Sequence, residues 1–343
     1  MFSIANLHHD RQDSVKTRDG GQAEEPDGSY DGCGLTSRSQ RAMPELPDVT
    51  VYVEALERHV LGARLERIRL GSPFVLRSVD PPLAVAHGLA VESVDRLGKR
   101  IVLGLEADLF VILHLMVAGR LRWRKPGAVL PKRRGLAAFE FGTGTVLFTE
   151  EGSKHRAGLW IVQGEQALAA HDPGGIEPLD VSVEAFRAAV TGGRHTLKRI
   201  LTDPHVFSGI GNAYSDEILH AARLSPLQLS TNLDDTEIAR LHEATQHTLV
   251  RWTDRLRSEV GDGFPEKVTA LRDGMAVHGR YREPCPDCGS PVQRIRYAEN
   301  EVNYCAVCQT RGKILADRAL SRLLKEDWPR SIDEWEARIQ NAE

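Results

Sequence analysis

The stretch CPDCGSPVQRIRYAENEVNYCAVC (285–308) holds two Cys-x-x-Cys pairs separated by sixteen residues. Two thiolates three positions apart fit one tight turn and can bind the same tetrahedral ion, and a second pair completes a set of four. The pattern therefore predicts one structural Zn²⁺ ion, because four thiolates leave no open coordination position for catalysis. The predicted ligands are Cys285, Cys288, Cys305 and Cys308. The interval between the pairs predicts a two-stranded ribbon with residues 298–300 at its tip.

Basic residues gather around this finger, although the whole chain is slightly acidic. Lys and Arg number 44 against 48 Asp and Glu, and the net charge of −4 excludes a protein that coats nucleic acid by bulk positive charge. Between residues 280 and 325, however, nine basic residues stand against five acidic ones. This local positive field suits nucleic acid. A protein-binding zinc ribbon with solvated basic residues is the alternative that the finger alone leaves open.

The length and composition set wider limits. A chain of 343 residues, 41% of them apolar, is long enough for two domains with separate cores. The sequence excludes a membrane-spanning protein, because no apolar run approaches the roughly 18–20 residues that a span requires. Five cysteines, four of them in the finger, argue against a disulfide-rich secreted protein.

The chain before the finger changes from strand patterns to helical patterns. One helix with Asp48 as N-cap and Gly62 as its end is predicted first, followed by strands at residues 63–70, 100–105, 109–117, 121–124, 136–142 and 145–149. Short strands at this spacing predict a β-sandwich. Helical periodicity then predicts helices at residues 183–190, 195–203, 213–224 and 235–260.

These patterns predict an α+β protein whose segments differ in composition. Residues 1–42 contain 11 apolar residues and show no periodicity, which predicts a disordered arm or a misassigned start. The predicted segments are the arm at 1–42, an N-terminal β-sandwich domain at 43–172, a hinge at 173–182, a helical domain at 183–263, the zinc finger at 277–310 and a helical tail at 311–343.

The segment MPELPDVTVYVEALERHVLG (43–62) resembles the amino terminus of the formamidopyrimidine-DNA glycosylase and endonuclease VIII family. Four further segments resemble motifs of that family in the same order: RLGKRIVL (96–103), HLMVAGRL (114–121), TLKRILTDPHVFSGIGNAYSDEILHAARLSP (196–226) and VHGR (277–280) before the finger. The resemblance covers about residues 44–310. It implies an N-terminal helix with a β-sandwich, a helix-two-turns-helix domain and a zinc-finger ribbon.

The resemblance also implies a catalytic set, namely Pro44, Glu45 and Lys99. An α-amino group has a pKa of about 7.7–8.0 and keeps a neutral fraction at neutral pH, whereas a lysine amine near 10.4 is protonated. An N-terminal proline can therefore attack the sugar C1′ and form an iminium ion. Pro44 is internal in the chain as written, so this role requires translation to start at Met43 or the arm to be removed.

Family roles in DNA contact fall on Lys198, Asn212 and Met116, and Glu217 matches a glutamate near the flipped lesion. The two glycines before Asn212 lead into a helix start, where free N–H groups favour a phosphate. The chain departs from the family at Asn300, where the finger usually carries an arginine. Asparagine lacks the charged, bidentate grip of a guanidinium, so the resemblance does not decide whether a second, δ-type elimination occurs. Met116 stands one place earlier than the family's methionine.

The expected function is a bifunctional DNA glycosylase and abasic-site lyase of base excision repair, acting on damaged double-stranded DNA. Oxidised purines, ring-opened purines and oxidised pyrimidines are all open as substrates. The alternatives are a non-catalytic, zinc-finger DNA-lesion-binding protein on the same fold and a zinc ribbon that binds another protein. The resemblance implies a monomer without a membrane partner, located in a bacterial-type cytoplasm with the nucleoid.

Overall fold

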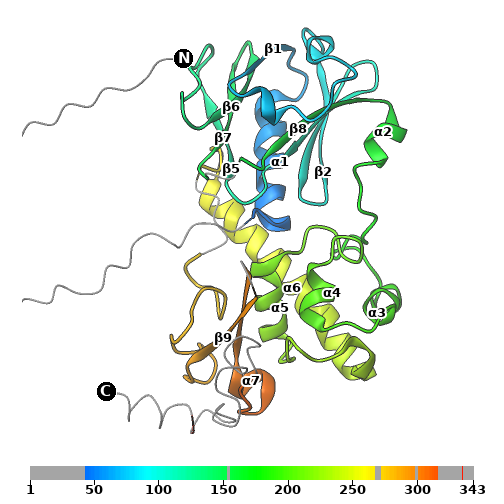
Figure 1. The fold of residues 1–343 in the computed structure, drawn as a ribbon, viewed down its shortest axis with the longest axis vertical. Coiled ribbons are helices and arrows are strands. Elements are labelled where there is room, and N and C mark those ends of the chain that lie inside the picture. The colour runs from blue at the N-terminus through cyan, green and yellow to red at the C-terminus, as the bar shows by residue number, and fades with distance from the viewer. Residues whose placement is uncertain (1–42, 153–154, 267–271, 298–299, 316–333, 335–343) are drawn as a thin grey trace, which may run out of the picture. The chain divides into compact units, whose positions relative to one another are not determined.

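The computed structural model describes residues 43–152, 155–266, 272–297, 300–315 and 334 (Figure 1). The predicted arm at 1–42 and all but Glu334 of the predicted tail beyond residue 315 lie outside the described residues. Among the described helices, none combines the length and the apolarity that a membrane span requires.

The first helix, α1 (Leu46–Val60), begins three residues earlier than the sequence predicts. Glu45, and not Asp48, is its N-cap, so the predicted cap is wrong. Pro47 lies in the first turn, where a helix loses no hydrogen bond to a proline, and the helix therefore starts before it. Asp48 completes the cap from inside the helix, since its Oδ2 accepts the Glu45 N–H at 2.9 Å.

Two four-stranded antiparallel sheets follow α1 and confirm the predicted β-sandwich. One sheet has the order β1 (Leu65–Leu70), β6 (Gly135–Phe141), β7 (Gly144–Glu150), β5 (Gly119–Arg124), and the other β2 (Val91–Leu97), β3 (Arg100–Leu105), β4 (Leu109–His114), β8 (Gly158–Gln163). The sequence missed β2 and β8. In β2 the run VESVDRL has only three apolar residues and follows two short 3-10 turns, η1 (Pro73–Val75) and η2 (Leu83–Ala86).

Helix α1 joins two hydrophobic cores. Its residues Val49, Tyr52 and Leu56 pack with the inner faces of both sheets, whereas Leu46 belongs to the core of the helical half. The first turn of α1 therefore lies where the two halves of the chain meet. In Figure 1 this helix (blue) runs beside the sheets toward the longest helix, α6.

The helical half comprises α3 (Val183–Thr191), α4 (Leu197–Thr202), α5 (Asn212–Ala221), η3 (Ser230–Asn232) and α6 (Asp235–Val260), after the short α2 (Glu165–Ala169). Helix α6 confirms the prediction for 235–260, and its capping box explains the start, because Asp234 Oδ1 accepts the Glu237 N–H at 2.8 Å. It packs against both α1 and α5.

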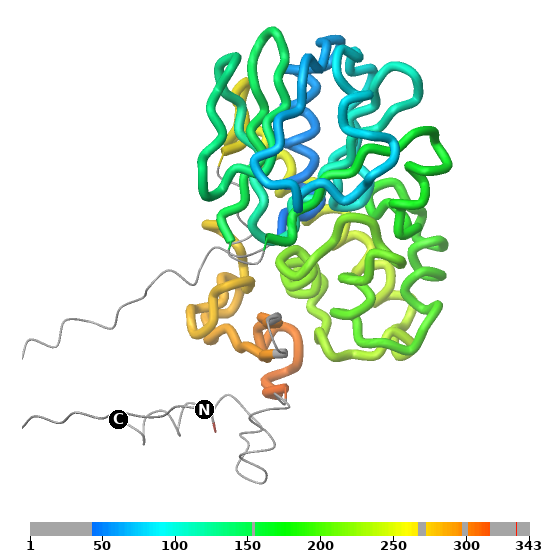
Figure 2. Tube along the Cα trace, turned by 45° about the horizontal axis from the view of Figure 1, so that its top comes forward, coloured from blue at the N-terminus to red at the C-terminus, as the bar shows by residue number. Residues whose placement is uncertain are grey.

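The finger is a hairpin of β9 (Val292–Tyr297) and β10 (Asn300–Cys305), followed by the short α7 (Ala306–Thr310). This confirms the predicted ribbon. Asn300 pairs with Tyr297 at the end of the hairpin where β9 leads into β10. Strand β10 and α7 both pack on α5, and Figure 2 shows the finger (orange) beside the green helical segment.

Candidate active site

The first turn of α1 brings Glu45 to the start of α5. Glu45 is 1% exposed, and its carboxylate accepts the backbone N–H groups of Gly211, Ala213 and Tyr214 at 2.8, 2.8 and 3.1 Å. Unpaired N–H groups and the positive end of the helix dipole favour an anion at a helix start. The sequence predicted free N–H groups for a DNA phosphate here. That expectation is wrong for these three groups, because a carboxylate of the same chain already binds them.

Lys99 converges on the same point from the turn between β2 and β3. A Cβ atom at Gly211 would lie 2.5 Å from Glu45 Cδ and 2.6 Å from Lys99 Nζ, so a larger residue there would displace one of these side chains. Burial lowers the pKa of Lys99, and the Glu45 carboxylate opposes that shift. Burial likewise raises the pKa of Glu45, and Lys99 opposes it. A buried acid and a buried amine with perturbed pKa values mark a candidate catalytic pair, and Pro44, also buried, directly precedes the acid.

Lys198 and Asn212, both predicted to contact DNA, are close together beside this pair. Lys198 Nζ donates to the Asn212 carbonyl at 2.6 Å and to Asp216 Oδ1 at 2.5 Å. The side-chain amide of Asn212 donates to the Glu301 carbonyl in β10 at 2.9 Å. An ammonium has three donors, so two intramolecular bonds leave Lys198 one donor for a ligand.

Asp216 and Glu217 tie α5 to the chain that leads into the finger. Asp216 Oδ2 lies 2.8 Å from Nδ1 of His278 and accepts the Asn303 N–H at 3.1 Å. Glu217, predicted to lie near the lesion, is 2% exposed. Its carboxylate accepts three backbone N–H groups at 2.7–3.0 Å, those of Ala276, Val277 and His278. Both oxygens of Glu217 therefore hold the segment that precedes the finger.

Met116 lies in the turn between β4 and β5 and has a positive φ of 50°. A Cβ at Gly119 would lie 2.3 Å from the Leu115 carbonyl, which shows how tightly this turn closes. His114 ends β4 just before the turn. Burial, together with the positive charges of Arg100 and Lys99, lowers the pKa of His114 to about 4. The turn is thus joined electrostatically to the Glu45–Lys99 pair.

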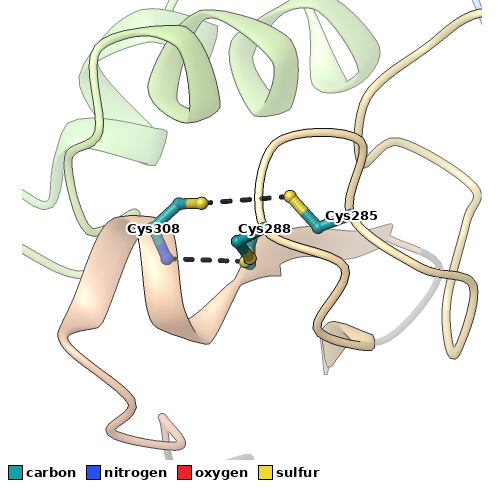
Figure 3. A group of neighbouring side chains, drawn as sticks. Cys285, Cys288 and Cys308 are labelled. Carbon is teal, nitrogen blue, oxygen red and sulfur yellow. Dashed lines mark hydrogen bonds between the residues drawn. The ribbon is translucent and has the colours of Figure 1, made fainter.

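The four cysteines of the finger converge as predicted. Their sulfur atoms all lie within 4.8 Å of one another, with Cys285 Sγ 3.9 Å from Cys308 Sγ and Cys288 Sγ 3.4 Å from Cys305 Sγ. Figure 3 shows Cys285 and Cys308 facing each other across this site. A tetrahedral zinc with Zn–S bonds of about 2.3 Å places its sulfurs about 3.8 Å apart. The number, type and spacing of the donors therefore fit zinc.

One neighbour of this site escaped the sequence reasoning. His220 on α5 is 4% exposed, and its Nε2 lies 3.3 Å from Cys285 Sγ. It stands four residues after Asp216, so both side chains leave α5 on the face that packs on the finger. That spacing was visible in the sequence, but the partner of the face was not.

Comparisons with known proteins agree with this architecture. The N-terminal domain of formamidopyrimidine-DNA glycosylase matches residues 43–172, and the H2TH domain of the same enzyme matches residues 175–255. A formamidopyrimidine-DNA glycosylase of Roseiflexus is 31% identical over 278 residues, which cover 78% of this chain and 100% of the relative. The chain belongs to the formamidopyrimidine-DNA glycosylase family.

Two further proteins of similar sequence or structure span different lengths of this chain. The crystal structure of the MutM (Fpg) protein of Thermus thermophilus is 29% identical with a TM-score of 0.65, over 78% of this chain and 98% of that one. An uncharacterized formamidopyrimidine-DNA glycosylase-like protein of Mycobacterium tuberculosis is 42% identical over 151 residues, which cover 44% of this chain and 94% of the relative. Family membership makes this protein a DNA glycosylase that acts on damaged DNA.

Proposed function

We propose that this glycosylase is bifunctional and cleaves both the base–sugar bond and the DNA strand through the amine of Pro44. The observation that carries the proposal is the convergence of Glu45 and Lys99 on Gly211, directly beside Pro44. The proposed substrates are oxidised or ring-opened bases in double-stranded DNA, which the enzyme must turn out of the helix to reach C1′.

The chemistry begins when the neutral Pro44 nitrogen attacks C1′ and the C1′–N bond to the base breaks, with the electron pair leaving on the protonated base. Opening of the sugar ring gives an iminium ion between Pro44 and C1′, with the ring oxygen protonated to a hydroxyl. The iminium charge acidifies the C2′ proton, and its removal expels the 3′ phosphate. In this scheme Glu45 moves protons at the opened sugar, and Lys99 holds a phosphate and relays a proton during elimination, roles that the perturbed pKa values of both groups support.

The DNA surface in this proposal runs from the Met116 turn past Lys198 and Asn212 to Asn300 in the finger. Met116 fills the gap left by the displaced nucleotide, and Glu217 borders the base pocket by holding residues 276–278. The cysteines Cys285, Cys288, Cys305 and Cys308 hold zinc, which when bound supplies only a cross-link that fixes the hairpin. The enzyme works as a monomer on DNA in the cytoplasm.

A second candidate function has one observation in its favour. In the chain that begins at Met1, the Pro44 nitrogen is part of a peptide bond to Met43 and cannot attack. A protein retaining that bond would hold damaged DNA without forming a covalent link. The lyase therefore requires a mature chain that begins at Pro44.

Borohydride trapping tests the two candidates. A chain that begins at Pro44 keeps every described residue except Met43, and we expect it to form a reducible adduct with an abasic-site duplex. The full chain of 343 residues is the control, and we expect it to give no adduct through Pro44, because that nitrogen is part of the peptide bond to Met43. Salt-sensitive binding without an adduct from the Pro44 chain would instead identify a non-catalytic lesion-binding protein.

A further inference from the structure

A buried ion pair lies directly behind the first turn of α1. Arg272 Nη2 donates to Asp48 Oδ1 at 2.6 Å, and the two side chains are 9% and 0% exposed. Arg272 comes from the connection between α6 and the finger, 224 residues along the chain from its partner. The other Asp48 oxygen accepts the N–H of Glu45 at 2.9 Å. One carboxylate thus joins Arg272 to the peptide group that links Pro44 and Glu45.

A helix cap does not need such a pair. A neutral serine, threonine or asparagine caps a helix start well, and burying two charges has a desolvation penalty that can exceed their attraction. Charged pairs are retained where they fix one geometry more strictly than apolar packing does. The same helix offers a contrast: Glu54 pairs with Arg257 at 2.7 Å, but these side chains are 27% and 49% exposed and lie away from the cap.

Glu45 is restrained twice by these contacts. The start of α5 holds its carboxylate through three N–H groups, and Asp48 holds its backbone N–H. Because Pro44 is bonded to that backbone nitrogen, the direction of its ring depends on the Asp48 carboxylate. A nucleophile displaced by about 1 Å can lose on the order of a hundredfold in rate.

We propose that Arg272 is a positioning residue for Pro44, which it orients through Asp48 and the Glu45 peptide group. This inference rests on the proposed lyase function. Arg272 also lies 3.7 Å from Glu259 near the end of α6, so the guanidinium links α6 to the start of α1. Arg272 itself touches neither the DNA nor the reacting atoms in this scheme. Its loss is expected to slow the chemistry while leaving DNA binding nearly unchanged.

The test compares variants of the chain that begins at Pro44. Arg272→Met removes the charge and Arg272→Lys keeps it. Arg257→Met is the matched control, because it breaks the exposed pair between Arg257 and Glu54 of α1. For each variant, two quantities are measured on an abasic-site duplex: the dissociation constant, and the single-turnover rate of borohydride trapping with enzyme in excess. We expect Arg272→Met to lower the trapping rate about 10- to 100-fold with the dissociation constant changed less than about threefold. Arg272→Lys should recover most of the rate, and Arg257→Met should change neither quantity.

Each outcome has one meaning. If folded Arg272→Met traps DNA at the unsubstituted rate, or loses binding and rate in parallel, the positioning role is wrong while the lyase stands. If the unsubstituted chain never traps, the proposed function fails first and the inference falls with it. Should Arg272→Met not fold, the double variant Asp48→Asn with Arg272→Met removes the unpaired charge and keeps an acceptor for the Glu45 N–H. A trapping rate equal to the unsubstituted rate in that variant would show that the charged pair is dispensable and overturn the proposal, and a reduced rate with intact binding would support it.

Discussion

Glu45 and Glu217 are two buried glutamates that solve the same hydrogen-bonding problem in two regions of the molecule. Each accepts three backbone N–H groups, Glu45 from the start of α5 and Glu217 from residues 276–278. Glu45 has the Lys99 amine beside it and adjoins Pro44. Glu217 instead fastens the connection between α6 and the finger. The comparison teaches that the neighbours of a saturated carboxylate, and not its hydrogen bonds, distinguish a chemical role from a structural one.

The largest expected effect is that of Glu45→Gln on strand cleavage. Glutamine keeps one carbonyl oxygen for the α5 N–H groups and leaves at least one of them without an acceptor, so some stability is lost. Glutamine also cannot exchange a proton, so we expect the single-turnover cleavage rate to fall about 10²- to 10³-fold. Thermal unfolding should show a folded protein. A variant that cleaves at the unsubstituted rate would remove Glu45 from the chemistry and leave the two glutamates alike.

Glu217→Gln should lower stability in the same way but have little effect on cleavage. Replacing one oxygen by an amide leaves at least one buried N–H of residues 276–278 without an acceptor, and we expect the free energy of unfolding to fall by about 2–3 kcal/mol. Urea unfolding measures this change. In the absence of urea, where the variant is folded, the cleavage rate should fall less than tenfold. Lost cleavage at unchanged stability would instead support a direct contact between Glu217 and the base.

The pH dependence of stability gives a separate test of the Glu45 region, because Lys99 is one of the groups that lower the pKa of His114. The pKa of His114 is about 4 in the folded protein, against 6.5 when unperturbed. Between these values the unfolded chain binds a proton that the folded chain does not, so stability is full above pH 6.5 and is lost as the pH falls toward 4. Allowing for partial exposure, we expect a loss of about 1–2 kcal/mol. His114→Gln should abolish this part of the pH dependence in urea unfolding between pH 7 and pH 4.5, and an unchanged slope would contradict it.

The sequence predicted the features whose signals lie within a few neighbouring residues, and it did not predict those that depend on residues far apart in the chain. The cysteine pairs and α6 carry their signals within a few residues, and both predictions were confirmed. Strand β2 was missed because its outward positions are charged. The α1 cap was misplaced because an aspartate after Pro47 looks like an N-cap, although Glu45 holds that position.

The site itself was predicted only in part. The family resemblance assigned Glu45 and Lys99 to one catalytic set, and in the structure both side chains lie beside Gly211. Their connection to α5 could not be derived from the sequence, because Glu45 and Gly211 are 166 residues apart and no local pattern links a carboxylate to a distant helix start. The same holds for Arg272 and Asp48. In each case the partners are brought together by packing of the two halves around α1.

The smallest expected effect extends the comparison along α5 to the finger. His220 faces Cys285 Sγ at 3.3 Å, and a zinc-bound thiolate can only accept there, so the imidazole must donate its Nε2 proton. Partners of this kind tune metal affinity by about 10- to 100-fold. We expect His220→Phe to weaken zinc binding about tenfold in a chelator competition, whereas His247→Phe, on the exposed side of α6, should leave it unchanged. Since Glu45 and Glu217 are untouched by this change, the cleavage rate with saturating zinc should stay within about threefold of the unsubstituted rate. Equal zinc affinity in both variants would show that α5 supports the finger by packing alone.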